Sequence, residues 1–328
     1  MYSFSGGAAD KWDSARFLAV FNASAESRSQ AFSRPAHLRL TQAVGLHQKE
    51  NKVSNLASLA FQAFGSNNAP TIVFLHGGGV GGWMWQPVIK HLSEYHCLAP
   101  DQPEHGGSRA IAPFSIELAA EKVTELIRDQ AHEGKAYVVG LSEGAQITVQ
   151  LLATAPERVE KAIVSSALIR PIVGIGWASS PSLLAWMYRL SIPPFINNDW
   201  WIRLNMKYSA GIPDEYYSDF KKSFQEITES EFVNLMITNQ RFRLPTGLEK
   251  ANVPTLALAG KKEYSAMKQS VRDLVSAMPT AKGCLVNLGK NSSMAKEHNW
   301  ALTAPELFAQ TLRAWIEDML LPPAIEDL

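Results

Sequence analysis

The sequence predicts an α/β domain, a mostly parallel twisted sheet with helices on both faces, interrupted by a helical insertion. Two features predict this fold class. From about residue 56, short apolar tracts alternate with amphipathic helical patterns, and an aromatic-rich stretch at about residues 168–250 breaks the alternation before it resumes. Strands that alternate with helices form parallel sheets, whose ligand site lies at the carboxyl ends of the strands.

The predicted strands are short, apolar and bounded by turn residues. They cover residues 56–64, 71–75, 96–100, 136–140, 161–167, 255–260 and 283–288. Between them lie helical patterns at residues 84–95, 115–130, 144–155, 265–278 and 304–319. In the second of these, Leu118, Val123 and Ile127 share one face, as expected for a helix that packs on a sheet.

The chain is expected to divide into three parts. Residues 1–55 form an N-terminal extension without a recognisable period, residues 56–167 and 251–328 form the core, and residues 168–250 form a helical cap. Most aromatic rings of the cap are expected to build its own small core. A few could instead line a substrate pocket, and the candidates are Trp177, Trp186 and Trp200.

Composition narrows the possible partners. Hydrophobic residues make up 46% of the 328 positions, charged residues 19%, and the formal net charge is zero. A small-molecule substrate is therefore expected, and neither nucleic acid nor a membrane. Cys97 and Cys284 lack the spacing of a disulfide framework or a zinc site, and no signal peptide is visible, so a cytoplasmic protein without metal or cofactor is predicted. The sequence predicts no oligomeric state.

A serine stands between two glycines at the boundary of a predicted strand and helix. Residues 140–144 read Gly-Leu-Ser-Glu-Gly, the G-x-S-x-G pattern of a nucleophile elbow. A β-carbon at Gly140 or Gly144 would crowd such a turn, and the turn pushes the serine side chain out above the sheet. Because the pattern falls between a strand and a helix, Ser142 is predicted to be a nucleophile rather than part of an ordinary turn.

A glycine cluster, His76 to Gly79, follows the predicted strand 71–75. Backbone N–H groups in such a loop can face the oxyanion that forms when a serine attacks a carbonyl. The predicted donors are the N–H of Gly78, with Gly79 as the second choice, and the N–H of Glu143. A phosphate-binding loop is disfavoured because no G-x-x-x-x-G-K-[ST] pattern is present.

A serine nucleophile also needs a base and a carboxylate that orients the base. With a G-x-S-x-G elbow, the three groups occur along the chain in the order nucleophile, acid, histidine. Of the eight histidines only His298 follows Ser142, so it is the predicted base. Glu263, three residues beyond the predicted strand 255–260, is the predicted acid, since residues 161–198 contain no Asp or Glu. Glu297 is expected to be solvated.

Together these segments resemble the α/β-hydrolase fold superfamily over about residues 56–320. The resemblance implies a capped serine hydrolase with an HGGG oxyanion loop, in which Ser142, His298 and Glu263 form the triad. His105, in a loop similar to D-x-P-G-H-G-x-S, is expected to be structural. The sequence departs from the family pattern at Glu263, where Asp is usual, and at Glu104, which replaces a glycine.

The expected activity is cleavage of a small, neutral or apolar carboxylic ester, thioester, amide or lactone through an acyl-enzyme on Ser142. No metal or organic cofactor is required for this chemistry. Two alternatives remain open, because one fold hosts many functions. One is a small-molecule-binding receptor with negligible turnover, and the other is a lyase that uses the same three residues.

Overall fold

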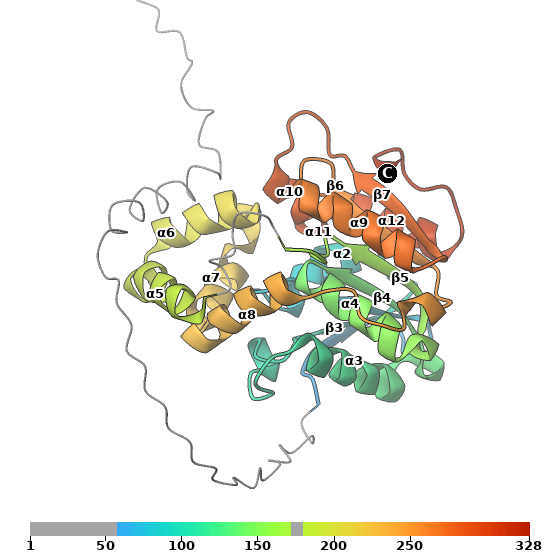
Figure 1. Ribbon diagram of the computed structural model, residues 1–328, viewed down its shortest axis with the longest axis horizontal. Coiled ribbons are helices and arrows are strands. Elements are labelled where there is room, and N and C mark those ends of the chain that lie inside the picture. The colour runs from blue at the N-terminus through green and yellow to red at the C-terminus, as the bar shows by residue number, and fades with distance from the viewer. Residues whose placement is uncertain (1–57, 172–179) are drawn as a thin grey trace, which may run out of the picture. The chain divides into compact units, whose positions relative to one another are not determined.

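A computed structural model of the chain describes residues 58–171 and 180–328. The predicted extension and residues 172–179 of the predicted cap, which include Trp177, lie outside these residues. An eight-stranded sheet, in the order β1-β3-β2-β4-β5-β6-β7-β8, forms the centre of the described part (Figure 1). Adjacent strands from β3 through β7 are parallel, and the two edge strands, β1 and β8, are antiparallel to their neighbours. The predicted fold class is confirmed.

The eight strands of this sheet overlap the ranges that the sequence predicts, except for β8, which the sequence does not predict. They are β1 (Phe61–Phe64), β2 (Thr71–Leu75), β3 (His96–Pro100), β4 (Ala136–Leu141), β5 (Val159–Ser165), β6 (Thr255–Gly260), β7 (Ala281–Val286) and β8 (Ile325–Asp327). All residues of β2, β3 and β6 are buried. Such continuous apolar runs are typical of strands covered on both faces, which explains why these three are readily recognised in the sequence.

The helices of the core cover both faces of the sheet. They are α2 (Gln86–Ile89), α3 (Ile116–Gln130), α4 (Glu143–Thr154), α9 (Ser265–Ala277), α10 (Met294–His298), α11 (Trp300–Thr303) and α12 (Pro305–Ile316). One hydrophobic cluster joins α3, α4 and α9 to the sheet, and the other joins α2, α11 and α12. Within β2, Val73 and Leu75 enter the first cluster while Ile72 and Phe74 enter the second, as strand alternation requires.

Four further α-helices lie between β5 and β6 among the residues that the structure describes, in the region where the sequence predicts an insertion. They are α5 (Pro181–Ser191), α6 (Asp199–Leu204), α7 (Tyr217–Glu226) and α8 (Glu229–Arg241). In Figure 1 they form a group to the left of the sheet. Thr228 and Glu231 form a capping box that fixes the start of α8. This capping box fixes the turn between α7 and α8, which also contributes residues to the wall of a polar cavity.

No helix in residues 58–171 and 180–328 is both long enough and apolar enough to cross a membrane.

Candidate active site

Ser142 occupies a strained turn between β4 and α4. Its backbone angles are φ 57° and ψ −114°, a combination that residues other than glycine rarely adopt. The two flanking glycines are required by space. A β-carbon on Gly140 would lie 2.2 Å from the carbonyl oxygen of Gly144, and one on Gly144 would lie 2.1 Å from the carbonyl oxygen of Leu75. The G-x-S-x-G segment therefore adopts the sharp strand-to-helix turn that the pattern predicts.

Hydrogen bonds draw distant parts of the chain toward this turn. The Ser142 N–H donates to the carbonyl of Ser165, at the end of β5, over 2.9 Å. The hydroxyl of Ser165 accepts a hydrogen bond of 2.9 Å from Nε1 of Trp300, two residues after His298. Ser165 thus contacts both the serine turn and the histidine segment, which lie more than 150 positions apart in the sequence.

His298 and Glu263 form an ion pair at the carboxyl edge of the sheet. Nδ1 of His298 lies 2.5 Å from Oε1 of Glu263, and the histidine side chain is 27% exposed whereas that of Glu263 is 2% exposed. Burial alone would lower the pKa of His298, but the charge and hydrogen bond of Glu263 outweigh it and raise the pKa above its usual value. With Nδ1 engaged by the carboxylate, Nε2 is the nitrogen left to accept a proton.

Ser166 is a residue of this site that the sequence analysis missed. Its hydroxyl donates to Oε2 of Glu263 over 2.8 Å, and the Gly260 N–H donates to the same oxygen over 2.6 Å. Ser166 is 1% exposed and has a φ of 58°, an uncommon value for serine. The loop after β5 contains no Asp or Glu, and the serine at that place instead holds Glu263, which follows β6.

Lys262 connects the loop that carries Glu263, here called the acid loop, to the segment before His298. Its Nζ donates to the carbonyls of Gly289, Lys290 and Ser292, at 3.0, 3.0 and 2.5 Å. Its backbone N–H donates to Oε2 of Glu297 over 2.6 Å, and Glu297 is 0% exposed. The expectation that Glu297 is solvated is therefore wrong, because its carboxylate accepts a hydrogen bond from the acid loop and is buried beneath it.

No hydrogen bond joins the Ser142 hydroxyl to His298 or to any other residue that the structure describes. Ser142 is a half-buried residue, and Nε2 of His298 is likewise without a hydrogen bond to the described residues. In enzymes without substrate such bonds are often long or misaligned and shorten only in the substrate complex. Of the predicted triad, the structure thus shows the hydrogen bond between His298 and Glu263 but none between His298 and Ser142.

In the glycine loop after β2, some backbone N–H groups have partners among the described residues and one does not. The Gly77 N–H contacts Sδ of Met84 at 3.5 Å, and the Gly79 N–H donates to Nε2 of His105 over 3.3 Å. The Gly78 N–H makes no hydrogen bond to the described residues, and neither does the Glu143 N–H at the first turn of α4, where no intrahelical partner exists. Of the two candidate glycines, Gly78 is the one with a free donor.

Two neutral histidines hold this loop in place. His76 is 0% exposed, and burial lowers its pKa to about 3. Its Nδ1 lies 2.7 Å from the Gly77 carbonyl, and Nε2 accepts the N–H of Gln102 over 3.0 Å. Burial lowers the pKa of His105 as well. A neutral imidazole can accept a backbone N–H, which a protonated one cannot, so both rings fit structural roles.

The family model of the α/β hydrolase fold matches residues 70–286. The chain belongs to the α/β-hydrolase fold family. This α/β hydrolase is 40% identical over 97 residues to an AB hydrolase superfamily protein of Gibberella zeae, a match covering 29% of the chain and 34% of that relative. It is 37% identical over 99 residues to an esterase of Mycobacterium tuberculosis, covering 30% of the chain and 33% of the esterase. The matches thus span about a third of each relative's length.

Solved structures share the fold of this α/β hydrolase. A lipase-esterase related protein from Clostridium acetobutylicum superposes with a TM-score of 0.62 at 16% identity. The superposition covers 79% of the present chain and 100% of that protein. At this level of identity the likeness concerns the fold alone.

A carboxyl group lies buried beside Ser142 of this α/β hydrolase. Glu143 is 0% exposed, and neither of its carboxyl oxygens has a hydrogen-bond partner within the described part of the chain. Burial, and secondarily the charge of Glu104, raises the pKa of Glu143 to about 8. A buried carboxylate without partners is costly, so the neutral acid is the form that the folded state favours.

Replacing Glu143 with glutamine is expected to change how stability depends on pH. The ordinary pKa of 4.5 rises to about 8 on folding, so the folded state takes up a proton and the wild type loses stability as pH rises between these values. The Gln variant lacks this loss, which amounts to at most about 1.4 kcal/mol per pH unit. Urea unfolding at pH 5, 6, 7 and 8 measures the difference in unfolding free energy, with Glu157→Gln, at an exposed position, as the control. Parallel curves for wild type and Glu143→Gln would contradict the prediction.

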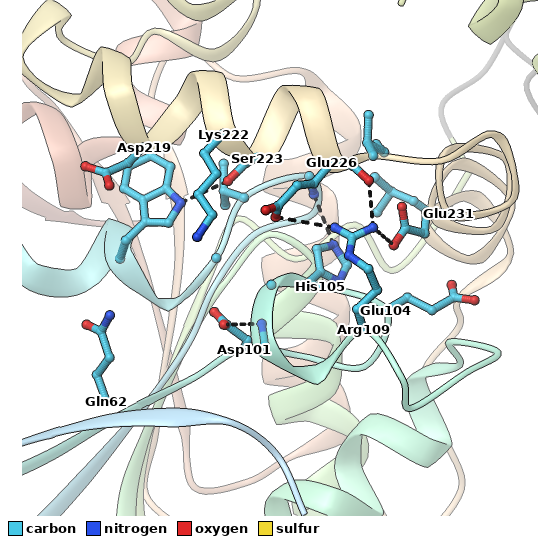
Figure 2. A pocket seen from close by; sticks show the side chains of 18 of the residues that line it. Gln62, Asp101, Glu104, His105, Arg109, Asp219, Lys222, Ser223, Glu226 and Glu231 are labelled. Atoms are coloured by element: carbon cyan, nitrogen blue, oxygen red, sulfur yellow. Dashed lines mark hydrogen bonds and ion pairs between the residues drawn. The ribbon is translucent and has the colours of Figure 1, made fainter. Parts of the chain in front are cut away.

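A polar cavity of about 190 Å³ lies between the loops after β2 and β3 and the helices α7 and α8 (Figure 2). Arg109, in the loop after β3, extends across the cavity to the α7–α8 turn. Its Nη1 donates to the Glu226 carbonyl over 2.6 Å and lies 2.5 Å from Oε1 of Glu231. Ser142 and His298 do not line this cavity, whereas Gly79 of the glycine loop does.

The tryptophans predicted for the pocket lie away from this cavity. Trp186 on α5 is 51% exposed and Trp200 on α6 is 67% exposed, and neither lines the cavity. Trp177 lies outside the described residues. Between residues 58–171 and 180–328, no group of three or more His, Cys, Asp or Glu side chains is arranged to hold a metal ion.

Proposed function

We propose that this α/β hydrolase is a capped serine hydrolase that cleaves a small, neutral or apolar carboxylic ester, thioester, amide or lactone through an acyl-enzyme on Ser142. The observation that carries the proposal is the buried Glu263 carboxylate paired with His298, at the sheet edge where Ser142 occupies a strained strand-to-helix turn. The esterase of Mycobacterium tuberculosis named above supports the same class of reaction.

In the proposed reaction, Oγ of Ser142 attacks the carbonyl carbon while its proton passes to Nε2 of His298. The Glu263 carboxylate stabilises the resulting imidazolium through Nδ1. The negative charge on the carbonyl oxygen is met by the N–H groups of Gly78 and Glu143. Collapse of this intermediate expels the leaving group, which takes the proton from His298 and leaves Ser142 acylated.

Deacylation uses the same groups in a second cycle. A water molecule attacks the acyl carbonyl while His298 accepts one of its protons. The carbon–oxygen bond to Ser142 then breaks, the serine oxygen recovers the proton, and the carboxylic acid is released. The four helices between β5 and β6 act in this proposal as a cap, since Leu235 of α8 packs against Gly78.

Covalent labelling with a fluorophosphonate tests the proposal. The folded protein is expected to gain one adduct on the peptide that contains Ser142 and to hydrolyse p-nitrophenyl acetate. A folded protein that neither labels nor turns over the ester, yet binds small molecules, would favour the receptor alternative. Turnover of a substrate that contains no ester, without formation of an acyl-enzyme, would favour the lyase alternative.

A further inference from the structure

Leu235 packs against the glycine loop and also lines the polar cavity. A β-carbon on Gly77 would lie 3.6 Å from Cβ of Ser142, so this loop passes directly beside the nucleophile. On the next residue, Gly78, a β-carbon would lie 2.3 Å from Cδ1 of Leu235. The Leu235 side chain of α8 therefore packs against the backbone of the glycine that carries the free N–H.

Leu235 is also part of the wall of the polar cavity. Gly79 and Val80, the residues that follow Gly78, line the same cavity. Leu235 and the glycine loop beside Ser142 therefore both border the cavity, and they contact each other at Gly78. At about 190 Å³ the cavity is smaller than the roughly 300 Å³ and more that usually hold a whole ligand, so it fits one arm of a substrate rather than a complete one.

The cavity wall is polar and carries more acids than bases. Arg109 and Lys222 are its basic residues, and in Figure 2 the amine of Lys222 points into the open space. Five carboxylate residues line it as well: Asp101, Glu104, Asp219, Glu226 and Glu231. A hydrocarbon chain would gain little here, because these groups would lose water without receiving hydrogen bonds. A carboxylate arm would be repelled, while a hydroxyl or ammonium arm could donate hydrogen bonds to the wall.

We propose that Leu235 is the specificity-determining residue of this hydrolase. It closes the space beside the oxyanion glycine and so restricts the enzyme to substrates with short arms. With the leucine side chain shortened, the polar cavity joins the site and admits arms that end in a hydroxyl or amine. This inference rests on the proposed function.

Leu235→Ala tests the role of the leucine with a set of p-nitrophenyl esters. The probes are the acetate, hexanoate, octanoate, 6-hydroxyhexanoate, 6-aminohexanoate and the monoester of adipate. Relative to acetate, kcat/KM for the hydroxy and amino esters is expected to rise roughly 10-fold to 100-fold over the wild type, the range that one pocket contact usually provides. Hexanoate, octanoate and adipate esters are expected to gain several-fold less.

Two further variants keep the test decisive. Leu190→Ala removes a leucine that is 48% exposed on α5 and does not line the cavity, and it is expected to leave every ratio unchanged. Leu235→Phe enlarges the side chain and is expected to lower kcat/KM for hexanoate relative to acetate, a result that remains informative if Leu235→Ala does not fold.

Each outcome bears on one proposal or the other. A wild type that hydrolyses none of the esters contradicts the proposed function. A wild type that cleaves acetate, with ratios unmoved in both Leu235 variants, overturns the role of Leu235. Equal gains for octanoate and 6-hydroxyhexanoate in Leu235→Ala overturn the assignment of the polar cavity as the newly opened space.

Discussion

Ser142→Ala is expected to lower kcat for ester hydrolysis by about 10⁴-fold to 10⁶-fold, the cost of removing a serine nucleophile from a triad. The remaining groups could still bind substrate and polarise its carbonyl, so KM is expected to change far less than kcat. Steady-state kinetics with p-nitrophenyl acetate measures both constants. Labelling by fluorophosphonate should disappear in the same variant.

Ser142→Gly separates loss of chemistry from loss of fold. Ser142 has a φ of 57°, and a residue held in such a conformation costs about 1–3 kcal/mol, most of which glycine avoids. The glycine variant is therefore expected to unfold at a higher temperature than the wild type while being as inactive as Ser142→Ala. An inactive variant with a raised Tm cannot owe its inactivity to unfolding. Activity within tenfold of the wild type in either variant would contradict the role of Ser142.

The parts of the fold that the sequence predicted well are those with a strong local signal. Strands β2 and β6 have the predicted bounds because each is a fully buried apolar run with turn residues at both ends. For β7 the prediction was residues 283–288 and the structure has Ala281–Val286, a strand of mixed burial whose ends are weakly marked. The short edge strand β8 was not predicted, since three residues carry too little pattern.

The candidate site shows a similar division. Gly140, Ser142 and Gly144 could be read from one pentapeptide because the turn itself dictates those residues. Ser166 and Leu235 could not, because their importance comes from partners distant in the chain. A serine or leucine carries no such information in its own neighbourhood.

Glu263→Gln is expected to lower kcat by about 10³-fold to 10⁴-fold, by analogy with amide substitution of the acid in serine triads. The amide can present an N–H toward Nδ1 of His298, which favours the wrong tautomer and removes the charge that stabilises the imidazolium. The surrounding donors are Ser166 and Gly260, which point at Oε2 and are matched to a carboxylate. Circular dichroism and Tm report whether the variant keeps its fold.

The pH dependence of kcat/KM gives this prediction a second, sharper readout. His298 must be neutral to accept the serine proton, and Glu263 raises its pKa above the ordinary 6.5, so wild-type activity should rise with pH through a midpoint above 6.5. In Glu263→Gln the raising charge is gone while burial, which lowers the pKa, remains, so the midpoint should move to lower pH. The ion pair also stabilises the folded protein below pH 6.5, and this contribution is lost as pH rises through the raised pKa. A wild-type midpoint below 6.5, or one unmoved by the substitution, would show that the titrating group is not His298 paired with Glu263.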